Sequence, residues 1–169
     1  MSTGAFRTGI GYDSHRFDAA RKLRLGGVTI PGVPGLAGHS DGDAICHAVT
    51  DAILGAAGLG DIGGMFPDTD PAHKNADSLE MLRAARERLA AAGWRVVNVD
   101  AAIVAERPRI APHREAMIRT LAPVLGVDRS GISLKGTTNE GMGWIGRGEG
   151  IAVMAVATVS RPVDANSRG

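Results

Sequence analysis

The chain has 169 residues, and its 19 basic and 18 acidic side chains give a net charge of +1. It therefore has no global field that would attract nucleic acid or an anionic membrane. A chain of this length can bury one core without disulfides, and its single cysteine, Cys46, cannot form an internal one. No stretch approaches the roughly 18 apolar residues of a membrane span, and residues 1–8 lack the apolar core of a signal peptide, so we expect a soluble, cytoplasmic protein.

The beginning of the chain predicts two strands. Residues 7–12 mix apolar residues with glycine and lead directly into Asp13-Ser14-His15, which is typical of a strand whose end carries polar groups. Residues 26–38 are rich in glycine and proline and contain a short apolar stretch, residues 28–30, that predicts a second strand. A functional site is therefore expected near the end of the first strand.

Two helices follow. Over residues 43–57 apolar residues recur at helical spacing, and Gly58 is a stop signal, so this helix is predicted to be buried on most sides. Residues 60–74 have no periodicity and many Gly, Asp and Pro residues, which predicts a loop. A second helix is predicted to begin at Asp77 and to end before Gly93.

The second half of the chain predicts three more strands and one more helix. Residues 94–105 are the clearest strand because they are rich in valine and isoleucine, and residues 132–135 and 150–159 complete the strands. A third helix is expected over residues 112–125, where Pro123 indicates a kink or a fresh helical turn.

The order of these elements predicts the fold class. Helices interleave with strands, and at least two strands form a hairpin-like pair, which indicates an α+β fold with a mixed β-sheet and helices packed on one face as a two-layer sandwich. We expect residues 1–161 to form a single domain and residues 162–169 to be a disordered polar tail.

Two polar patterns point to a metal site. Asp13 and His15 are two residues apart on a strand, so their side chains project from the same face. On the first predicted helix, His47 lies four residues after Asp43 and four before Asp51, on an otherwise apolar helix. Such buried groups need partners, and one carboxylate with two imidazoles is a donor set that catalytic zinc accepts. Spacing alone leaves open whether the two elements converge or whether these are ordinary satisfied polar residues.

A second polar segment, KGTTNE at residues 135–140, follows a predicted strand. It offers hydroxyls, backbone amides and a carboxylate where glycine permits close approach, so it is either a phosphate cradle or a plain turn. It lacks the spacing of a P-loop, and GRGEG at residues 146–150 precedes a strand instead of joining a strand to a helix. P-loop hydrolysis and dinucleotide binding are therefore disfavoured.

Longer blocks of the sequence carry a family resemblance. The blocks are GYDSHRF, AGHSDGDAICHAVTDAILGAAGLGDIG, FPDTDP, ADS, NVDAAIVAERPRIAPH and KGTTNEGMGWIGRGEGIA, within residues 7–159. In composition and order they resemble the signature blocks of the 2-C-methyl-D-erythritol 2,4-cyclodiphosphate synthase family of the non-mevalonate isoprenoid pathway. The long second block is far more specific than any three-letter spacing.

The resemblance implies an assembly and two kinds of metal site. It implies a homotrimer with the sheets facing the centre and with active sites between neighbouring subunits. Glu140 matches the residue that holds a second divalent cation, magnesium or manganese, and Asp43 and Asp51 match positions expected to orient the metal ligands. The positions that match zinc ligands are Asp13, His15 and His47.

The resemblance also implies the reaction. In the substrate, 4-diphosphocytidyl-2-C-methyl-D-erythritol 2-phosphate, the 2-phosphate oxygen attacks the β-phosphorus, a cyclic diphosphate closes and CMP leaves. His39 and Thr138 match catalytic positions that stabilise the transition state. Positions that match substrate contacts are Asp13, His15, His39, Ser40, Asp61, Ile62, Gly63, Phe66, Pro67, Asp68, Thr69, Asp70, Ala105, Glu106, Arg107, Pro108, Arg109, Ile110, Ala111, Thr137, Thr138, Asn139, Glu140, Trp144 and Arg147.

Two other functions compete with this interpretation. A zinc-dependent phosphoesterase would use the same three ligands to activate water and would release phosphate or a linear product. A binding module would keep the pocket without turnover, although the presence of Glu140, Thr138 and His39 argues against it. Neither alternative, nor the synthase, needs nucleic acid or a membrane as a partner.

Overall fold

The computed structural model describes residues 4–67, 69–73 and 75–162. Within them five strands form one sheet in the order β2-β1-β5-β3-β4, in which only the β3–β4 pair is parallel. The predicted α+β fold with a mixed sheet is therefore confirmed. Of the predicted tail, residues 163–169 lie outside the described residues. The elements are β1 (Ala5–Leu25), β2 (Val28–Leu36), α1 (Ala44–Ala57), α2 (Ile62–Met65), α3 (Ser78–Ala91), β3 (Arg95–Val104), α4 (Arg114–Leu125), β4 (Ile132–Thr137), α5 (Gly143–Gly146) and β5 (Gly150–Arg161), with 3-10 turns at Pro71–His73, Ala111–His113 and Arg129–Gly131.

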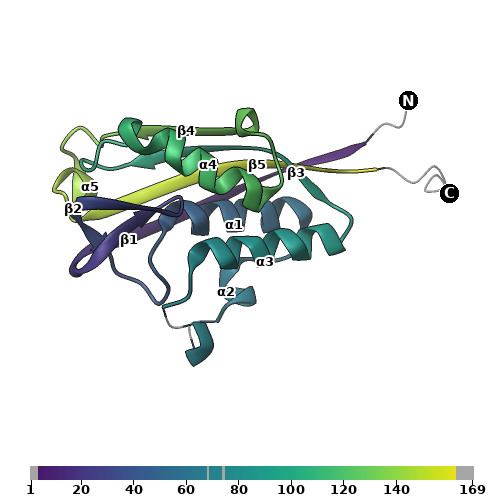
Figure 1. The fold of residues 1–169 in the computed structure, drawn as a ribbon, viewed down its shortest axis with the longest axis horizontal. Helices are drawn as coiled ribbons and strands as arrows, with labels where there is room; N and C mark the ends of the chain where they lie inside the picture. Colours follow the sequence, from purple (N-terminus) through teal and green to yellow (C-terminus); the bar gives the residue numbers. More distant parts are fainter. Residues whose placement is uncertain (1–3, 68, 74, 163–169) are drawn as a thin grey trace.

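The helices and the sheet form two layers around one core. In Figure 1 the sheet lies above α1 and α3, with α4 in front of its β4 edge. Residues of β5 alternate along the strand: Val153 and Ala155 are fully buried against α1, whereas Met154 and Val156 between and beyond them are 46% and 42% exposed. This period of two is the pattern of a strand in a sheet that is covered on one face only.

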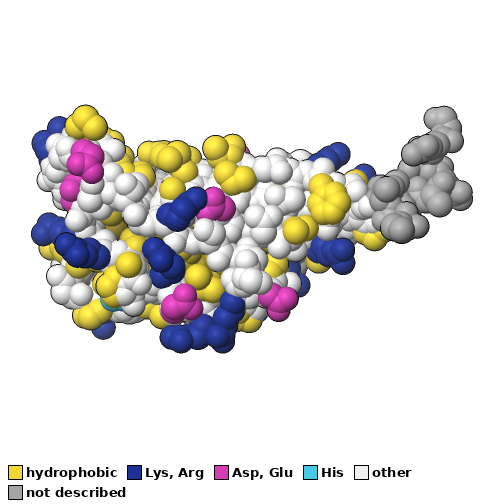
Figure 2. Space-filling view, turned by 90° about the horizontal axis from the view of Figure 1, so that it is seen from above, with side chains coloured by type: hydrophobic (Ala, Val, Ile, Leu, Met, Phe, Trp, Pro, Cys, Tyr) yellow, Lys and Arg dark blue, Asp and Glu magenta, His cyan; other side chains and the backbone are white. Residues whose placement is uncertain are grey.

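The face of the sheet away from α1 carries an open apolar patch. Its large members, which we call the open-face patch, are Ile10, Tyr12, Met154 and Val156, and cross-strand pairs join Ile10 to Val156 and Tyr12 to Met154. Figure 2, seen from above, shows hydrophobic side chains exposed along much of this side of the molecule, between basic and acidic ones. Contiguous exposed apolar surface of this kind is typical of a contact surface.

The first helix is the centre of the fold and matches its prediction. The Asp43 carboxylate accepts hydrogen bonds from the amides of Ile45 and Cys46 and so caps the amino terminus of α1. Gly58 ends the helix in a left-handed conformation with φ of 72°. Of the residues of α1, only Asp51 and Gly55 are not buried.

Two glycines bring α1 unusually close to β1. A Cβ atom added at Gly11 would lie 1.9 Å from the carbonyl oxygen of Ala48, and one added at Gly9 would lie 2.2 Å from that of Ala52. Since no larger residue fits at these positions, the glycines of β1 allow the helix to approach the strand's backbone directly. This close approach places residue 47 of the helix opposite the polar part of β1.

The first strand is longer than the sequence predicts. β1 has 21 residues, whereas the sequence pattern predicts a strand only over residues 7–12. The strand pairs with β5 as far as Arg16 and with β2 from Phe17 onward. Because each half has its own partner strand, the backbone stays extended through the polar residues between them. The strand predicted at residues 28–30 likewise continues, to Leu36, because it pairs with the second half of β1.

The predicted loop and the predicted helix break also differ from the structure. Residues 60–74 contain α2, whose amino terminus is capped by Asp61 through the amide of Gly64 at 2.7 Å. Helix α4 begins at Arg114 after a 3-10 turn and continues through Pro123 to Leu125, so no fresh helical turn forms. Pro123 provides no amide for the carbonyl of Arg119, and both residues lie on the exposed side of the helix, where water can reach that carbonyl.

Candidate functional site

The predicted metal ligands converge. The Oδ2 atom of Asp13 lies 2.8 Å from His15 Nε2 and 3.1 Å from His47 Nδ1, and the two imidazole nitrogens are 3.2 Å apart. Strand β1 supplies the first two residues from one face, and α1 supplies the third across the glycine contact. One donor atom from each residue lies within 4.8 Å of the others, so the three side chains are able to hold one metal ion.

The remaining nitrogen of each imidazole faces a hydrogen-bonding oxygen. His15 Nδ1 lies 2.6 Å from the carbonyl oxygen of Ala37, which only accepts, so this nitrogen carries the proton and Nε2 is free for a metal. His47 Nε2 lies 2.9 Å from the hydroxyls of both Ser40 and Ser78. Supporting contacts of this type fix the ring orientation of metal-binding histidines, so the donor set and its surroundings fit zinc.

The site favours positive charge beside its carboxylate. Burial raises the pKa of the Asp13 carboxyl, but the hydrogen bonds and charges of His15 and His47 outweigh burial and hold this pKa well below its usual range. Burial lowers the pKa of His15, and its hydrogen bond to Asp13 reverses the effect and raises the pKa overall. A cation placed among these groups would be stabilised by the same carboxylate.

The prediction that Asp43 and Asp51 orient the metal ligands is not met by their side-chain contacts. The Asp43 carboxylate accepts from the amides of Gly26 and Gly27, at 2.9 and 2.7 Å, as well as from its own helix. The Asp51 carboxylate accepts from the amide of Ile62 at 2.7 Å. Burial raises the pKa of both carboxyls, and amide hydrogen bonds partly offset it. Both residues hold backbone segments in place.

A cavity of about 410 Å³ opens beside the three ligands. Of the predicted substrate residues, it contains His39, Ser40, Ile62, Gly63 and Phe66 in addition to the ligands themselves. The exposed Asp61, Pro67, Thr69 and Asp70 belong to the same segment without lining this cavity, and Asp68 lies outside the described residues.

Three further residues that line this cavity, His73, Met81 and Gly38, were not predicted. His73 lines it and packs edge-on against Phe66 with ring centroids 5.3 Å apart, and Met81 reaches it from α3. The sequence contains a signal for the first, since His73 follows the acidic FPDTDP segment, but it gives none for Met81, which follows the ordinary helical period of α3.

Arg21 holds the loop that carries His39. Its Nη1 donates to the carbonyl oxygen of Gly38 at 2.6 Å, and its Nη2 donates to that of Ser40. The loop is anchored on the other side by the amide of Asn75, which donates to the His39 carbonyl at 2.7 Å. The exposed His39 side chain is therefore presented to the cavity from a backbone fixed on both sides.

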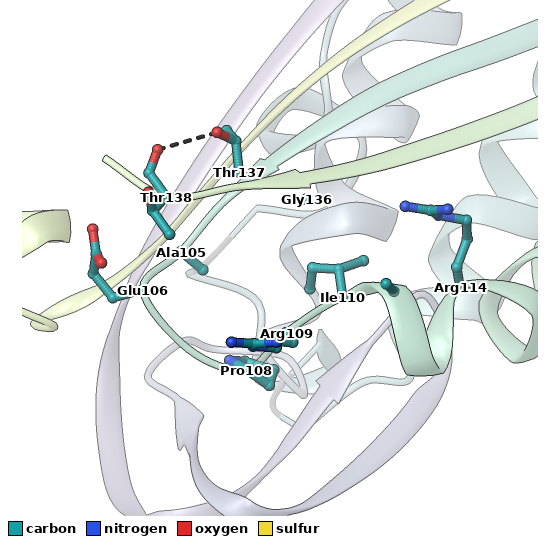
Figure 3. A pocket seen from close by; sticks show the side chains of 10 residues that line it. Ala105, Glu106, Pro108, Arg109, Ile110, Arg114, Gly136, Thr137 and Thr138 are labelled. Atoms are coloured by element: carbon teal, nitrogen blue, oxygen red, sulfur yellow. Dashed lines mark hydrogen bonds between the residues drawn. The ribbon is translucent and has the colours of Figure 1, made fainter. Parts of the chain in front are cut away.

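A second cavity, of about 400 Å³, contains most of the predicted nucleotide residues. Figure 3 shows Glu106 and Thr138 at one end, Ile110 in the middle and Arg114 at the other end. Gly136 of β4 lies so close to Ile110 that an added Cβ would be 2.8 Å from that side chain. The predicted residues in the lining are Ala105, Glu106, Pro108, Arg109, Ile110, Ala111, Thr137 and Thr138.

Arg114 lines this cavity and was not predicted to do so. Its Nε is buried without a hydrogen-bond partner among the described residues. A single arginine at the start of a predicted helix carries no distinctive sequence signal for a binding site. The predicted Arg107 does not line this cavity and instead stacks 5.7 Å above the ring of Phe17.

The segment after β4 forms a tight polar turn. Glu140 is exposed with φ of 52°, and the Thr138 hydroxyl donates to its Oε1 at 3.0 Å. The Glu106 carboxylate accepts from the amides of Asn139 and Gly141, at 3.0 and 3.4 Å, and so holds the turn from the neighbouring loop. The turn leaves the Glu140 carboxylate directed at solvent with a hydroxyl beside it.

The two cavities have no lining residue in common. Trp144 lines a third, smaller cavity of about 270 Å³ together with His15 and Glu149, and the exposed Arg147 pairs with Glu149 at 2.6 Å. One chain therefore places its three candidate metal ligands in one cavity and Thr138, two residues before Glu140, in another. Within the part of the chain that the structure describes, no helix is long and apolar enough to cross a bilayer.

Comparison with known proteins agrees with this architecture. The model of the YgbB family matches residues 6–160. A protein of Gemmatimonas aurantiaca named 2-C-methyl-D-erythritol 2,4-cyclodiphosphate synthase is 63% identical over 90% of this chain and 92% of its own length. A protein of the same name from Rubrobacter xylanophilus is 56% identical over 95% and 98%.

Solved structures give the same result. The CDP complex of IspF from Plasmodium falciparum superposes with a TM-score of 0.81 at 37% identity over 96% of this chain and 100% of that one. The bifunctional IspDF from Campylobacter jejuni superposes with a TM-score of 0.90 at 43% identity, over 94% of this chain and 43% of the bifunctional chain.

Fold and site together define an α+β protein with a candidate catalytic metal centre. The chain belongs to the YgbB family, and the predicted resemblance to cyclodiphosphate synthases is confirmed.

Proposed function

We propose that this chain is a cyclising synthase that converts 4-diphosphocytidyl-2-C-methyl-D-erythritol 2-phosphate into the cyclic diphosphate and CMP. The observation that carries the proposal is the convergence of Asp13, His15 and His47 beside a cavity lined by His39 and Ser40. The names of the relatives and a solved relative's complex with CDP support the same reaction. The phosphoesterase alternative has no observation that favours it.

In this proposal the two cavities would each receive one part of the substrate. The cavity lined by residues 105, 106 and 108–111 would receive the cytosine and ribose. There, backbone groups would read the base and Arg109 would lie near the phosphates. The cavity beside α2 would receive the methylerythritol part. Thr138 and His39 would donate hydrogen bonds to phosphate oxygens whose charge grows as the ring closes. Holding the attacking 2-phosphate oxygen in line with the leaving oxygen of CMP would lower the barrier further.

Asp13, His15 and His47 would hold zinc, and Glu140 would hold magnesium or manganese. When bound, these ions supply positive charge that polarises the β-phosphate and neutralises the leaving CMP. No side chain has to act as a nucleophile, because the attacking oxygen belongs to the substrate.

A homotrimer would bring the separated pockets together. The open-face patch is apolar, uncovered and continuous across β1 and β5, which suits sheets packed around a central axis. If the site lies between subunits, the metal ligands of one chain face the Glu140 turn of its neighbour. Within one chain, the cavity of the three ligands shares no lining residue with the cavity lined by Thr138, two residues before Glu140, and this separation supports the arrangement.

Mixing two inactive variants tests the shared site. His47→Ala and Glu140→Gln chains, co-expressed with two different affinity tags and purified through both, should recover CMP release. Purification through both tags keeps only mixed trimers, each of which has one of its three interfaces with both groups intact, so up to about one third of the wild-type rate is expected. Absence of recovery in mixed oligomers would place both groups in one chain's site and contradict the shared arrangement.

A further inference from the structure

His47 contacts two serine hydroxyls on the side of its ring that faces away from the other two candidate ligands. Its Nε2 lies 2.9 Å from Ser78 Oγ and 2.9 Å from Ser40 Oγ, and the two hydroxyls are 3.3 Å apart. Ser78 is fully buried at the start of α3 and Ser40 is 5% exposed. Both hydroxyls are therefore shielded from water and need defined hydrogen-bond partners.

The two serines differ in what lies behind them. The Ser78 hydroxyl donates to the Asp41 carboxylate, and the Ser78 amide donates to the other oxygen of the same carboxylate at 3.2 Å. The Ser40 hydroxyl accepts from the amide of Gly42 at 3.2 Å and has no carboxylate partner among the described residues. Of these two serines, Ser78 alone connects the Nε2 side of the imidazole to a carboxylate within the described part of the chain.

This carboxylate is in turn held by an arginine. Arg24 of β1 places its Nε 3.4 Å from Asp41 Oδ2 and its Nη2 3.0 Å from Asp77 Oδ2. Asp77 caps α3 through the amide of Leu79 at 2.8 Å. Asp41 is consequently fixed between β1 and the first turn of the helix that carries Ser78.

The proton positions follow from these contacts. The hydroxyl hydrogen of Ser78 is used on Asp41, so the lone pairs of its oxygen are left to accept a hydrogen from His47 Nε2. With its proton on Nε2, the imidazole presents a bare Nδ1 to Asp13 and His15, which is the atom that faces them at 3.1 and 3.2 Å. Because the Asp41 carboxylate polarises the Ser78 hydroxyl, the hydroxyl oxygen becomes a better hydrogen-bond acceptor, and the His47 imidazole becomes a more basic metal ligand.

We propose that Asp41 and Ser78 are positioning residues that act as a relay: they fix the tautomer and the ring orientation of His47 for metal binding. This proposal rests on the proposed zinc site and gives positioning roles to two residues that are not metal ligands. It takes the place that a carboxylate bound directly to a metal-binding histidine has in other zinc sites.

Zinc affinity measures the relay directly. The purified protein, in the oligomeric state that it adopts, is loaded with zinc and titrated with a chromogenic chelator. Ser78→Ala and Asp41→Asn should each weaken zinc binding by about 10–100-fold, the usual effect of losing such a supporting contact. The matched control Ser40→Ala removes the neighbouring hydroxyl at the same distance and should change zinc affinity less than about threefold, because no carboxylate stands behind it.

A double-mutant cycle separates a relay from a general packing defect. Because Asp41 acts through Ser78, the Asp41→Asn/Ser78→Ala variant should bind zinc no more weakly than Ser78→Ala alone. The visible absorption of Co²⁺-loaded protein should shift in Ser78→Ala and be restored in Ser78→Thr, which keeps the hydroxyl. If Ser78→Ala does not fold, Asp41→Asn and Ser78→Thr still decide the proposal by the same titration.

Two results overturn the relay. Zinc affinity in Ser78→Ala or Asp41→Asn within threefold of wild type would show that His47 needs no such support. Additive losses in the double variant would show that the two residues act independently. If the wild-type chain takes up no zinc, or if His47→Ala retains it fully, the proposed metal site itself is wrong. That outcome is distinct from a wild-type chain that binds zinc with an affinity that does not depend on Ser78.

Discussion

Replacing His47 with alanine is expected to remove bound zinc and to lower the rate of CMP release by more than about 100-fold, since even supporting residues of such sites contribute about 10–100-fold. The imidazole supplies the only donor from α1, and its Nδ1 lies within 3.2 Å of both other ligand side chains. Zinc per chain is measured by atomic emission after dialysis, and the rate is measured by chromatography of released CMP.

His73→Ala is the matched control for this variant. His73 lines the same cavity but is not one of the three converging ligands, so its loss should leave zinc content at the wild-type value. Far-UV circular dichroism should show that both variants fold, because α1 keeps its caps at Asp43 and Gly58. A His47→Ala protein that holds a full complement of zinc would contradict the assigned ligands.

The second large effect is expected at Glu140. Glu140→Gln keeps the size of the side chain and its contact with the Thr138 hydroxyl but removes the negative charge that would hold a divalent cation. The rate at saturating substrate should fall by about 10²–10³-fold, which is the usual loss when one charge-stabilising group is removed. Zinc content should stay unchanged, and the dependence of the remaining rate on added magnesium or manganese should flatten.

Glu106→Gln controls for the loss of a neighbouring charge. The glutamine oxygen can still accept from the amides of Asn139 and Gly141, so the turn is preserved while one negative charge beside it is lost. Its magnesium dependence should resemble that of the wild-type chain. If the Glu106 and Glu140 variants lose magnesium dependence equally, the cation responds to the local field and is not held by Glu140.

Short sequence signals predict much of this fold, because each of them acts on residues that are its neighbours in the chain. Asp43 and Gly58 are the caps of α1, and β3 and β5 match the valine-rich stretches that predict them. The length of β1 could not be predicted, because its second half depends on pairing with β2. The helix α2 could not be predicted either, since a four-residue helix has no period to detect.

Residue spacing alone predicts only the three candidate ligands of the site, whereas the predicted residues that line the cavities follow from the family resemblance. The spacing of Asp13 and His15 places both on one face, but their meeting with His47 depends on the close contact at Gly11, which is a property of the packed fold. The resemblance predicts that Asp43 orients the metal ligands, whereas its carboxylate accepts from the amides of Gly26 and Gly27 and of its own helix. Ser78 joins the site from 31 residues away, a distance at which spacing carries no information.

Phosphorus NMR of the purified chain with 4-diphosphocytidyl-2-C-methyl-D-erythritol 2-phosphate and magnesium tests the central claim most directly. We expect the substrate resonances to be replaced by those of CMP and of a cyclic diphosphate in equal amounts, and we expect conversion to stop when a zinc chelator is added and to resume with added zinc. Inorganic phosphate or a linear product would indicate a phosphoesterase, and unchanged substrate with zinc-loaded protein would indicate a binding module; either result would contradict the assigned reaction.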